Sequence, residues 1–129
     1  MNAYVYNELS ALMEACRLGW VEEVEALLFL DADPNERNRD GNTAIWLACY
    51  SNSIDSIHML IRYGADINNQ NNDGITPLMY VASAGKAEVL TALLEHGADP
   101  FLQNYDGLCA IELASNYDIL RMLKTVQVA

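Results

Sequence analysis

The sequence is poor in positive charge. Its 129 residues include 7 Lys and Arg against 18 Asp and Glu, which gives a formal net charge of −11. Because a chain this acidic repels phosphate groups and anionic lipid, we expect no direct binding to nucleic acid or to a membrane surface, and we expect a basic protein partner. A second interpretation, that the charge serves solubility alone, stays open.

Long hydrophobic runs and paired cysteines are also lacking. The most apolar segment, residues 24–30, is far shorter than the roughly 20 residues that cross a bilayer. The first residues have no positive charge ahead of an apolar run, as a secretory signal would, so we expect a soluble, cytoplasmic protein. The three cysteines, Cys16, Cys49 and Cys109, are widely spaced, which predicts reduced thiols rather than disulfides or a CxxC site.

Residues typical of catalysis or metal binding are scarce. The two histidines, His58 and His96, have no serine or cysteine at a nucleophile's spacing. The segment DADPNERNRDGN begins like a calcium-binding loop, but Glu36 and Asn42 stand where such a loop needs glycine and glutamate. No glycine-rich phosphate-binding loop occurs. The sequence therefore predicts no enzyme, no cofactor and no bound metal.

An internal repeat is present instead. Asp-Gly pairs recur every 33 residues, at 40–41, 73–74 and 106–107, and Ala-Asp pairs recur at 32–33, 65–66 and 98–99. The 52% of hydrophobic residues are enough for the core of one domain. We therefore predict a single domain over residues 1–129, with repeats near 7–39, 40–72 and 73–105 and a shortened repeat at 106–129.

Each repeat has a readable plan, clearest in the third. Asp73-Gly74 predicts a turn, Thr76 a helix cap and Pro77 the first helical residue. Gly85 and Gly97 predict the ends of a first and a second helix. Since one helix pair cannot bury both of its faces, the repeats must stack on one another. The sequence predicts an all-α solenoid of about four helix-turn-helix units with projecting loops.

These residues resemble the ankyrin repeats. The segment DGITPLMYVASAGKAEVLTALLEHGADP is similar to the family pattern DGxTPLHxAAxxGHxEVVxLLLxxGADxN along its length, and DGNTAIWLACYSNSIDSIHMLIRYGADIN matches nearly as well. The flanking segments look like an amino-terminal repeat and a shortened carboxy-terminal one. The resemblance implies a non-catalytic protein that binds other proteins through the concave face of the stack.

Departures from the family pattern are expected to have structural effects. Four residues stand where the family has a histidine: Met13, Trp46, Met79 and Glu112. Asp31 and Asn52 replace glycines that end helices, so we expect both in the left-handed conformation. The turn after Ala114 is about three residues short, and we expect Trp20 to pack against the first repeat.

The resemblance also implies which residues meet a partner: those at the loop tips and on the exposed side of each first helix. Tyrosine is frequent among them. The aspartates and tyrosines have a second interpretation, as turn and packing residues. The predicted contact residues are Arg39, Asp40, Asn42, Trp46, Tyr50, Asn72, Asp73, Ile75, Tyr80, Ser83, Tyr105, Asp106, Leu108 and Tyr117, and Tyr6, Asn7 and Leu9 would continue the row.

The sequence therefore predicts a protein-interaction module that binds a basic protein through an acidic, tyrosine-bearing face. An alternative is a dedicated inhibitor or immunity protein that neutralises a basic toxin or effector enzyme such as a nuclease. We expect a monomer, with weak self-association through Leu120, Met122, Leu123 and Val126 as another possibility.

Overall fold

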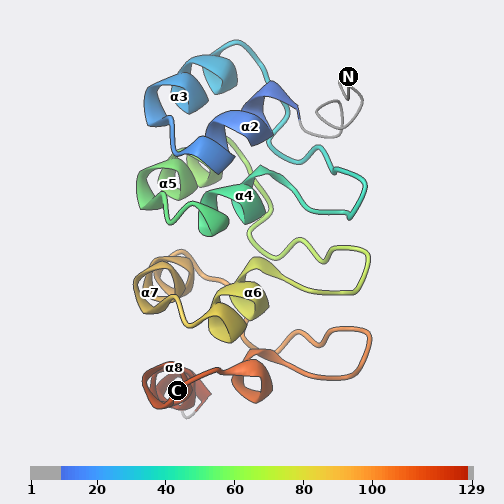
Figure 1. Ribbon diagram of the computed structural model, residues 1–129, viewed down its shortest axis with the longest axis vertical. Coiled ribbons are helices and arrows are strands. Elements are labelled where there is room, and N and C mark those ends of the chain that lie inside the picture. The colour runs from blue at the N-terminus through green and yellow to red at the C-terminus, as the bar shows by residue number, and fades with distance from the viewer. Residues whose placement is uncertain (1–9, 128–129) are drawn as a thin grey trace. The chain divides into compact units, whose positions relative to one another are not determined.

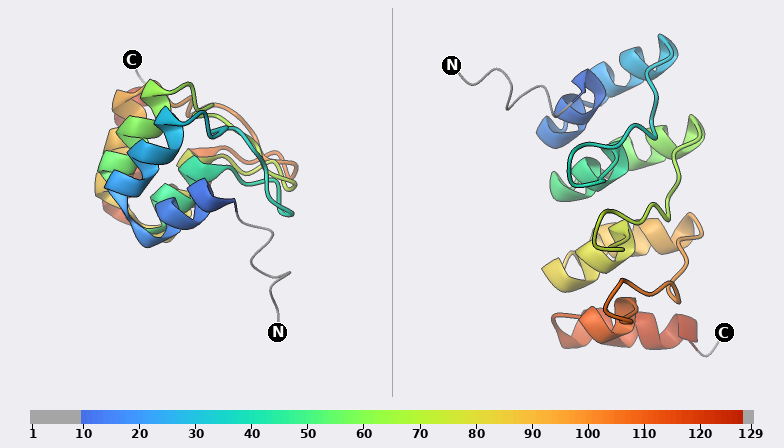
Figure 2. Two further views of the ribbon diagram at one scale, coloured as in Figure 1. Left: turned by 90° about the horizontal axis from the view of Figure 1, so that it is seen from above. Right: turned by 90° about the vertical axis from the view of Figure 1, so that its right-hand side faces the viewer.

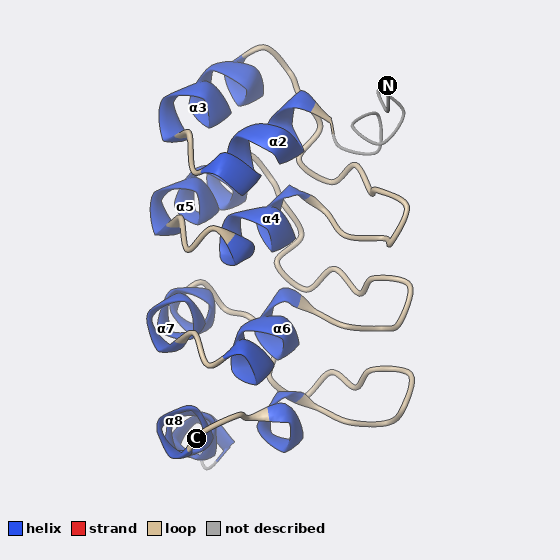
Figure 3. Ribbon diagram, in the orientation of Figure 1, coloured by secondary structure: helices blue, strands red, loops and turns tan. Residues whose placement is uncertain are grey.

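A computed structural model describes residues 10–127 of the chain (Figure 1). Over this range the protein has seven α-helices, one 3-10 helix and no strand, which confirms the all-α class (Figure 3). The helices are α2 (Ala11–Leu18), α3 (Val21–Phe29), α4 (Ala44–Tyr50), α5 (Ile54–Arg62), α6 (Pro77–Ala84), α7 (Ala87–Glu95), η1 (Ala110–Leu113) and α8 (Tyr117–Gln127).

The chain forms two compact units, Met1–Asp66 and Ile67–Ala129. In the first unit α2 pairs with α3 and α4 pairs with α5, and the two pairs stack because α2 packs against α4 and α3 against α5. The buried core of this unit includes Leu12, Cys16, Val24, Leu28, Ile45, Ala48, Ile57 and Leu60. The Ser51 hydroxyl also joins the two repeats by donating to the Cys16 carbonyl at 2.6 Å.

In the second unit α6 packs against α7 and η1, and α7 packs against α8. The loops that precede α6 and η1 both extend on the side of these elements away from α7 and α8 (Figures 1 and 2). The core of this unit includes Leu78, Met79, Val81, Leu90, Leu93, Ala110, Ile119 and Leu123.

The caps predicted for the third repeat are confirmed. Thr76 Oγ1 accepts a hydrogen bond from the Met79 amide at 3.2 Å, and Pro77 begins α6. Gly85 ends α6 in the left-handed conformation, with φ of 75°. The start and the end of α6 are therefore specified by residues within one turn of each end.

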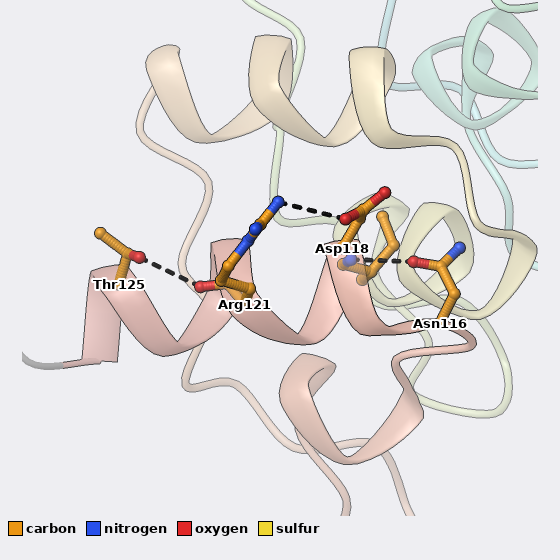
Figure 4. A network of polar contacts seen from close by, with 5 residues as sticks. Asn116, Asp118, Arg121 and Thr125 are labelled. Carbon is orange, nitrogen blue, oxygen red and sulfur yellow. Dashed lines mark hydrogen bonds and ion pairs between the residues drawn. The ribbon is translucent and has the colours of Figure 1, made fainter.

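The shortened last repeat departs from the plan of the others. Its first helix is η1, a 3-10 helix of 4 residues, and only residues 114–116 separate it from α8, which begins at Tyr117. The Asn116 side chain accepts from the Ile119 amide at 2.9 Å and so caps α8 (Figure 4). Farther along α8, the Arg121 guanidinium lies 3.1 Å from the Asp118 carboxylate, and the Thr125 hydroxyl donates to the Arg121 carbonyl at 3.0 Å (Figure 4). The predicted short turn after Ala114 is confirmed.

Two residues other than glycine adopt the left-handed conformation, as predicted. Asp31 has φ of 74° and Asn52 has φ of 61°. We expect Asp31→Gly to stabilise the protein by about 0.5–1 kcal/mol, because relief of the strain exceeds the added entropy of the unfolded chain. Urea unfolding followed by circular dichroism measures this change. Asn52→Gly is the control and should gain less, since asparagine tolerates this conformation better; an equal gain in both would contradict the argument.

The cysteines differ in accessibility. Cys16 and Cys49 are fully buried, Cys109 is half-buried, and burial raises the pKa of the Cys16 thiol to about 12. At pH 8 only about one Cys16 in ten thousand is then a thiolate, which is the reactive form. We expect a thiol reagent to modify one cysteine per chain readily and the other two only in denaturant. Rapid modification of two or three thiols in the native protein would contradict this.

Candidate protein-interaction surfaces

Three asparagines shape the loop tips, one in each of the first three loops. The side-chain oxygen of Asn38 accepts from the amides of Asp40 and Asn42, at 2.9 and 3.0 Å. Asn71 accepts in the same way from Asp73 and Ile75, both at 2.9 Å. In the third loop, Asn104 accepts from Asp106 and Leu108, at 2.9 and 3.0 Å. Each loop therefore closes around one side chain. This role was not among the predictions, although the 33-residue spacing of these asparagines indicates it.

Further hydrogen bonds tie neighbouring loops together within each unit. In the first unit, Asn35 accepts from the Asp66 amide at 2.7 Å and donates to the Gly64 carbonyl at 3.0 Å. In the second unit, Asn68 accepts from the Asp99 amide at 2.9 Å. Gln70 donates to the Gln103 carbonyl at 2.8 Å. These bonds hold the loop tips in a fixed conformation, which lowers the entropy that binding would cost.

In the first unit, the loop and α4 enclose a hollow of about 260 Å³. Its lining residues are Arg17, Asn38, Asp40, Asn42, Trp46, Leu47 and Tyr50. The structure thus brings together four of the predicted contact residues, Asp40, Asn42, Trp46 and Tyr50. Tyr50 is 56% exposed, whereas Asn42 is only 9% exposed and its amide is bound to Asn38. Asn42 therefore contributes mainly to the conformation of the loop. Arg39, another predicted contact residue, is exposed on the same loop.

The charge around this hollow is mixed. The Arg17 guanidinium donates to the Glu14 carboxylate at 2.6 and 3.1 Å. This hydrogen bond and, to a smaller extent, the attraction between the two charges lower the pKa of Glu14 and raise the pKa of Arg17. Exposed Arg37 and Arg39 precede Asp40 on the loop. Three of the seven Lys and Arg residues of the chain thus belong to this region, which makes it less acidic than the chain as a whole.

The second unit carries the other predicted contact residues on its loops and first helices. Asn72, Asp73, Ser83 and Asp106 are exposed, Tyr105 and Tyr117 are 74% and 70% exposed, and Ile75, Tyr80 and Leu108 are half-buried. We call the six residues Asn72, Asp73, Ile75, Tyr105, Asp106 and Leu108 the second-unit loop surface. Two of the tyrosines already lie near cations of the chain, since Lys86 is 5.9 Å from the Tyr80 ring centre and Arg121 is 5.6 Å from that of Tyr117.

Tyr105 joins the two loops of this surface. Its amide donates to the Asp73 carbonyl at 3.2 Å. A Cβ atom at Gly74 would lie 2.7 Å from the Tyr105 ring, so glycine is what allows the ring to lie this close to the neighbouring loop. The ring is therefore held in place and remains exposed, with an aspartate on each of the two loops.

The charge of the second-unit loops differs from that around the first-unit hollow. Between Ile67 and Leu120 the only Lys or Arg is Lys86, and Arg121 and Lys124 follow in α8. The same segment contains seven acids: Asp73, Glu88, Glu95, Asp99, Asp106, Glu112 and Asp118. The loop surface itself contains two aspartates and no base. The predicted acidic, tyrosine-bearing character therefore describes the second-unit loops better than the first-unit hollow.

Other features bear on the predicted function classes. Tyr6, Asn7 and Leu9 lie outside the described residues. Within residues 10–127 no group of three or more His, Cys, Asp or Glu side chains is placed to hold a metal ion. In the same part of the chain no helix combines the length and apolar character that a membrane span needs.

Stacked helix pairs with a loop after each pair define a helical repeat protein. A family model described as ankyrin repeats (3 copies) matches residues 1–71 and 55–128. The chain therefore belongs to the ankyrin repeat family, which confirms the resemblance seen in the sequence. A search of curated proteins gave no match. Ankyrin repeats are protein-protein interaction modules, generally without catalytic activity, and the chain is such a module.

Proposed function

We propose that the protein binds a basic partner protein through the second-unit loop surface. The observation that carries this proposal is the exposed Tyr105 ring, fixed against Gly74 and accompanied by Asp73 and Asp106. An aromatic ring attracts a Lys or Arg side chain to its face, and an aspartate beside it can accept hydrogen bonds from the same cation. Rings of this kind are frequent among the residues that contribute most to binding.

Rigidity supports the same proposal. Asn71 and Asn104 fix the two loop tips from within, and the bond between Tyr105 and Asp73 fixes one loop against the other. A partner would therefore meet a surface that is already ordered, so that little entropy is lost on binding. The surrounding negative charge would also speed the approach of a basic partner at low salt. As part of the proposal we place this interaction in the cytoplasm, with the protein a monomer.

Affinity capture with mass spectrometry, followed by titration calorimetry with the protein captured, tests this proposal. We expect Tyr105→Ala to weaken binding by about 2 kcal/mol, which is roughly thirtyfold. Asp73→Asn with Asp106→Asn should reduce the dependence of affinity on salt. The control is Tyr63→Ala, which removes a 38% exposed tyrosine at the end of α5 in the first unit. Equal losses in both tyrosine variants, or affinity independent of salt, would contradict the proposal.

The alternative function, a dedicated inhibitor of a basic toxin or effector enzyme such as a nuclease, is a narrower form of the same proposal. The net charge of −11 supports it, since a nuclease binds the phosphates of its substrate on a basic surface that an acidic protein complements. If the captured partner is an enzyme, we expect stoichiometric loss of its activity on addition of the protein. Binding that leaves the activity unchanged would reject the inhibitor role and keep the broader one.

A further inference from the structure

Three large apolar side chains are exposed at the two ends of α3 in the first unit. Trp20, directly before α3, is 58% exposed, so the expectation that it packs against the first repeat is wrong. Phe29 and Leu30, at the other end of the helix, are 76% and 75% exposed. The buried side of α3 is formed instead by Val24 and Leu28. Adjacent large apolar side chains that are both exposed, as Phe29 and Leu30 are, are typical of an interaction site.

The repeat provides an internal comparison for these positions. At a distance of 33 and 66 residues, Trp20 corresponds to Ser53 and Lys86. Phe29 corresponds to Arg62 and Glu95, and Leu30 corresponds to Tyr63 and His96. The second helices of the later repeats thus carry polar or amphipathic residues where the first carries apolar ones. The fold does not require apolar side chains at these positions, so their presence in α3 needs another explanation.

The segment that contains α3 carries charge of one sign. Between Leu18 and Glu36 there is no Lys or Arg, while six exposed acids occur: Glu22, Glu23, Glu25, Asp31, Asp33 and Glu36. Glu22 precedes Phe29 by seven residues and Glu23 precedes Leu30 by seven, which is about two helical turns, so each acid shares a side of α3 with an apolar residue. Favourable interaction with the helix start explains the first two glutamates but not the apolar residues beside them.

A hollow of about 470 Å³ lies at the start of α3. Its lining residues are Gly19, Trp20, Val21, Glu22 and Glu23. This combination fits a Lys or Arg side chain, because the apolar stem can lie on the indole while the cation reaches a carboxylate. At the other end of α3, Phe29 and Leu30 could contact apolar side chains of the molecule that supplies this cation.

We propose that the α3 patch, formed by Trp20, Glu22, Glu23, Phe29 and Leu30, docks a basic amphipathic segment of a partner protein. A second copy of the chain would bring like charges together, since its own α3 carries the same acids. The first nine residues of the chain contain one Glu and no Lys or Arg, so they do not complement this patch either. A segment that alternates cations with apolar residues complements both its charge and its apolar surface.

A synthetic 18-residue helical peptide of leucine and lysine is the probe, and the same peptide with glutamate for lysine is its control. We expect the basic peptide to shift the amide NMR signals of residues 19–33 and the acidic peptide to shift none. Phe29→Gln with Leu30→Gln keeps the charge and should weaken binding about tenfold. Glu22→Gln with Glu23→Gln keeps the apolar surface and should weaken binding several-fold at low salt and less at high salt. The matched control is Glu88→Gln, the position of α7 that corresponds to Glu22, which should change nothing.

Three outcomes would overturn the proposal. The first is shifts confined to residues 72–75 and 105–108, which would assign the peptide to the second-unit loop surface. The second is equal losses in all variants, which would indicate attraction to net charge alone. The third is concentration-dependent shifts of α3 without peptide, which would indicate self-association. Because all substituted residues are exposed, the variants are expected to fold, and circular dichroism verifies this.

Discussion

Gly74→Ala is expected to destabilise the protein by about 3 kcal/mol, the larger part of it through one contact between neighbouring loops. The residue has φ of 78°, a conformation that costs a residue with a Cβ atom about 1 kcal/mol. Its new methyl group would also lie 2.7 Å from the Tyr105 ring and 2.8 Å from the Tyr105 amide nitrogen. Because backbone is among the atoms in contact, the loops must separate, at a cost of about 2 kcal/mol.

Gly107→Ala is the matched control for this prediction. Gly107 has nearly the same conformation, with φ of 82°, but a Cβ atom there meets nothing within 4 Å. We expect this variant to lose only about 1 kcal/mol, the cost of the conformation itself. Urea unfolding of the two variants side by side measures the difference. Equal losses would show that the contact between Gly74 and Tyr105 contributes nothing.

Asn71→Ala is expected to destabilise the protein by about 2 kcal/mol. The side chain is 7% exposed and accepts from the amides of Asp73 and Ile75, both at 2.9 Å. Alanine would leave both donors without this acceptor, and one unmade hydrogen bond in a partly buried place costs about 1 kcal/mol. Thermal unfolding followed by circular dichroism gives the loss.

The next residue supplies the control, since Asn72 is exposed on the same loop. Asn72→Ala should change stability by less than about 0.5 kcal/mol, as exposed substitutions usually do. Asn71→Asp keeps an acceptor oxygen at the same place and should recover part of the loss. If Asn71→Asp is as unstable as Asn71→Ala, acceptance of the two amides is not what Asn71 contributes.

Most of the fold could be predicted from the sequence because its signals are local and repeated. The cap at Thr76, the first helical residue Pro77 and the helix end at Gly85 each depend on residues within one turn. The left-handed Asp31 and Asn52 followed from their alignment with glycines one repeat away. The 3-10 geometry of η1 could not be predicted, because it depends on how a shortened segment packs against α6.

The surfaces could be predicted only in part. Position within the repeat placed Tyr50 and Tyr105 among the exposed residues, but Asn42 lies under its own loop. The sequence also showed an excess of acid without showing where it lies. In the first unit much of it belongs to α3, while arginines occupy the loop side. Exposure of Trp20 was not predicted, although the corresponding residues of the later repeats, Ser53 and Lys86, are polar and indicate a position that the core does not require to be apolar.

The hydrogen bonds within the loop tips affect how fast the protein degrades chemically. Asp-Gly pairs in flexible chains slowly rearrange, because the glycine nitrogen attacks the aspartate side chain and forms a cyclic imide. In this protein the nitrogens of Gly41, Gly74 and Gly107 each donate to the carbonyl of the loop asparagine three residues earlier, at 2.9 Å. The glycine nitrogen is thus held toward the asparagine carbonyl and not toward the aspartate side chain. The fold thereby disfavours this rearrangement at all three Asp-Gly links, and the protection ends wherever a loop opens.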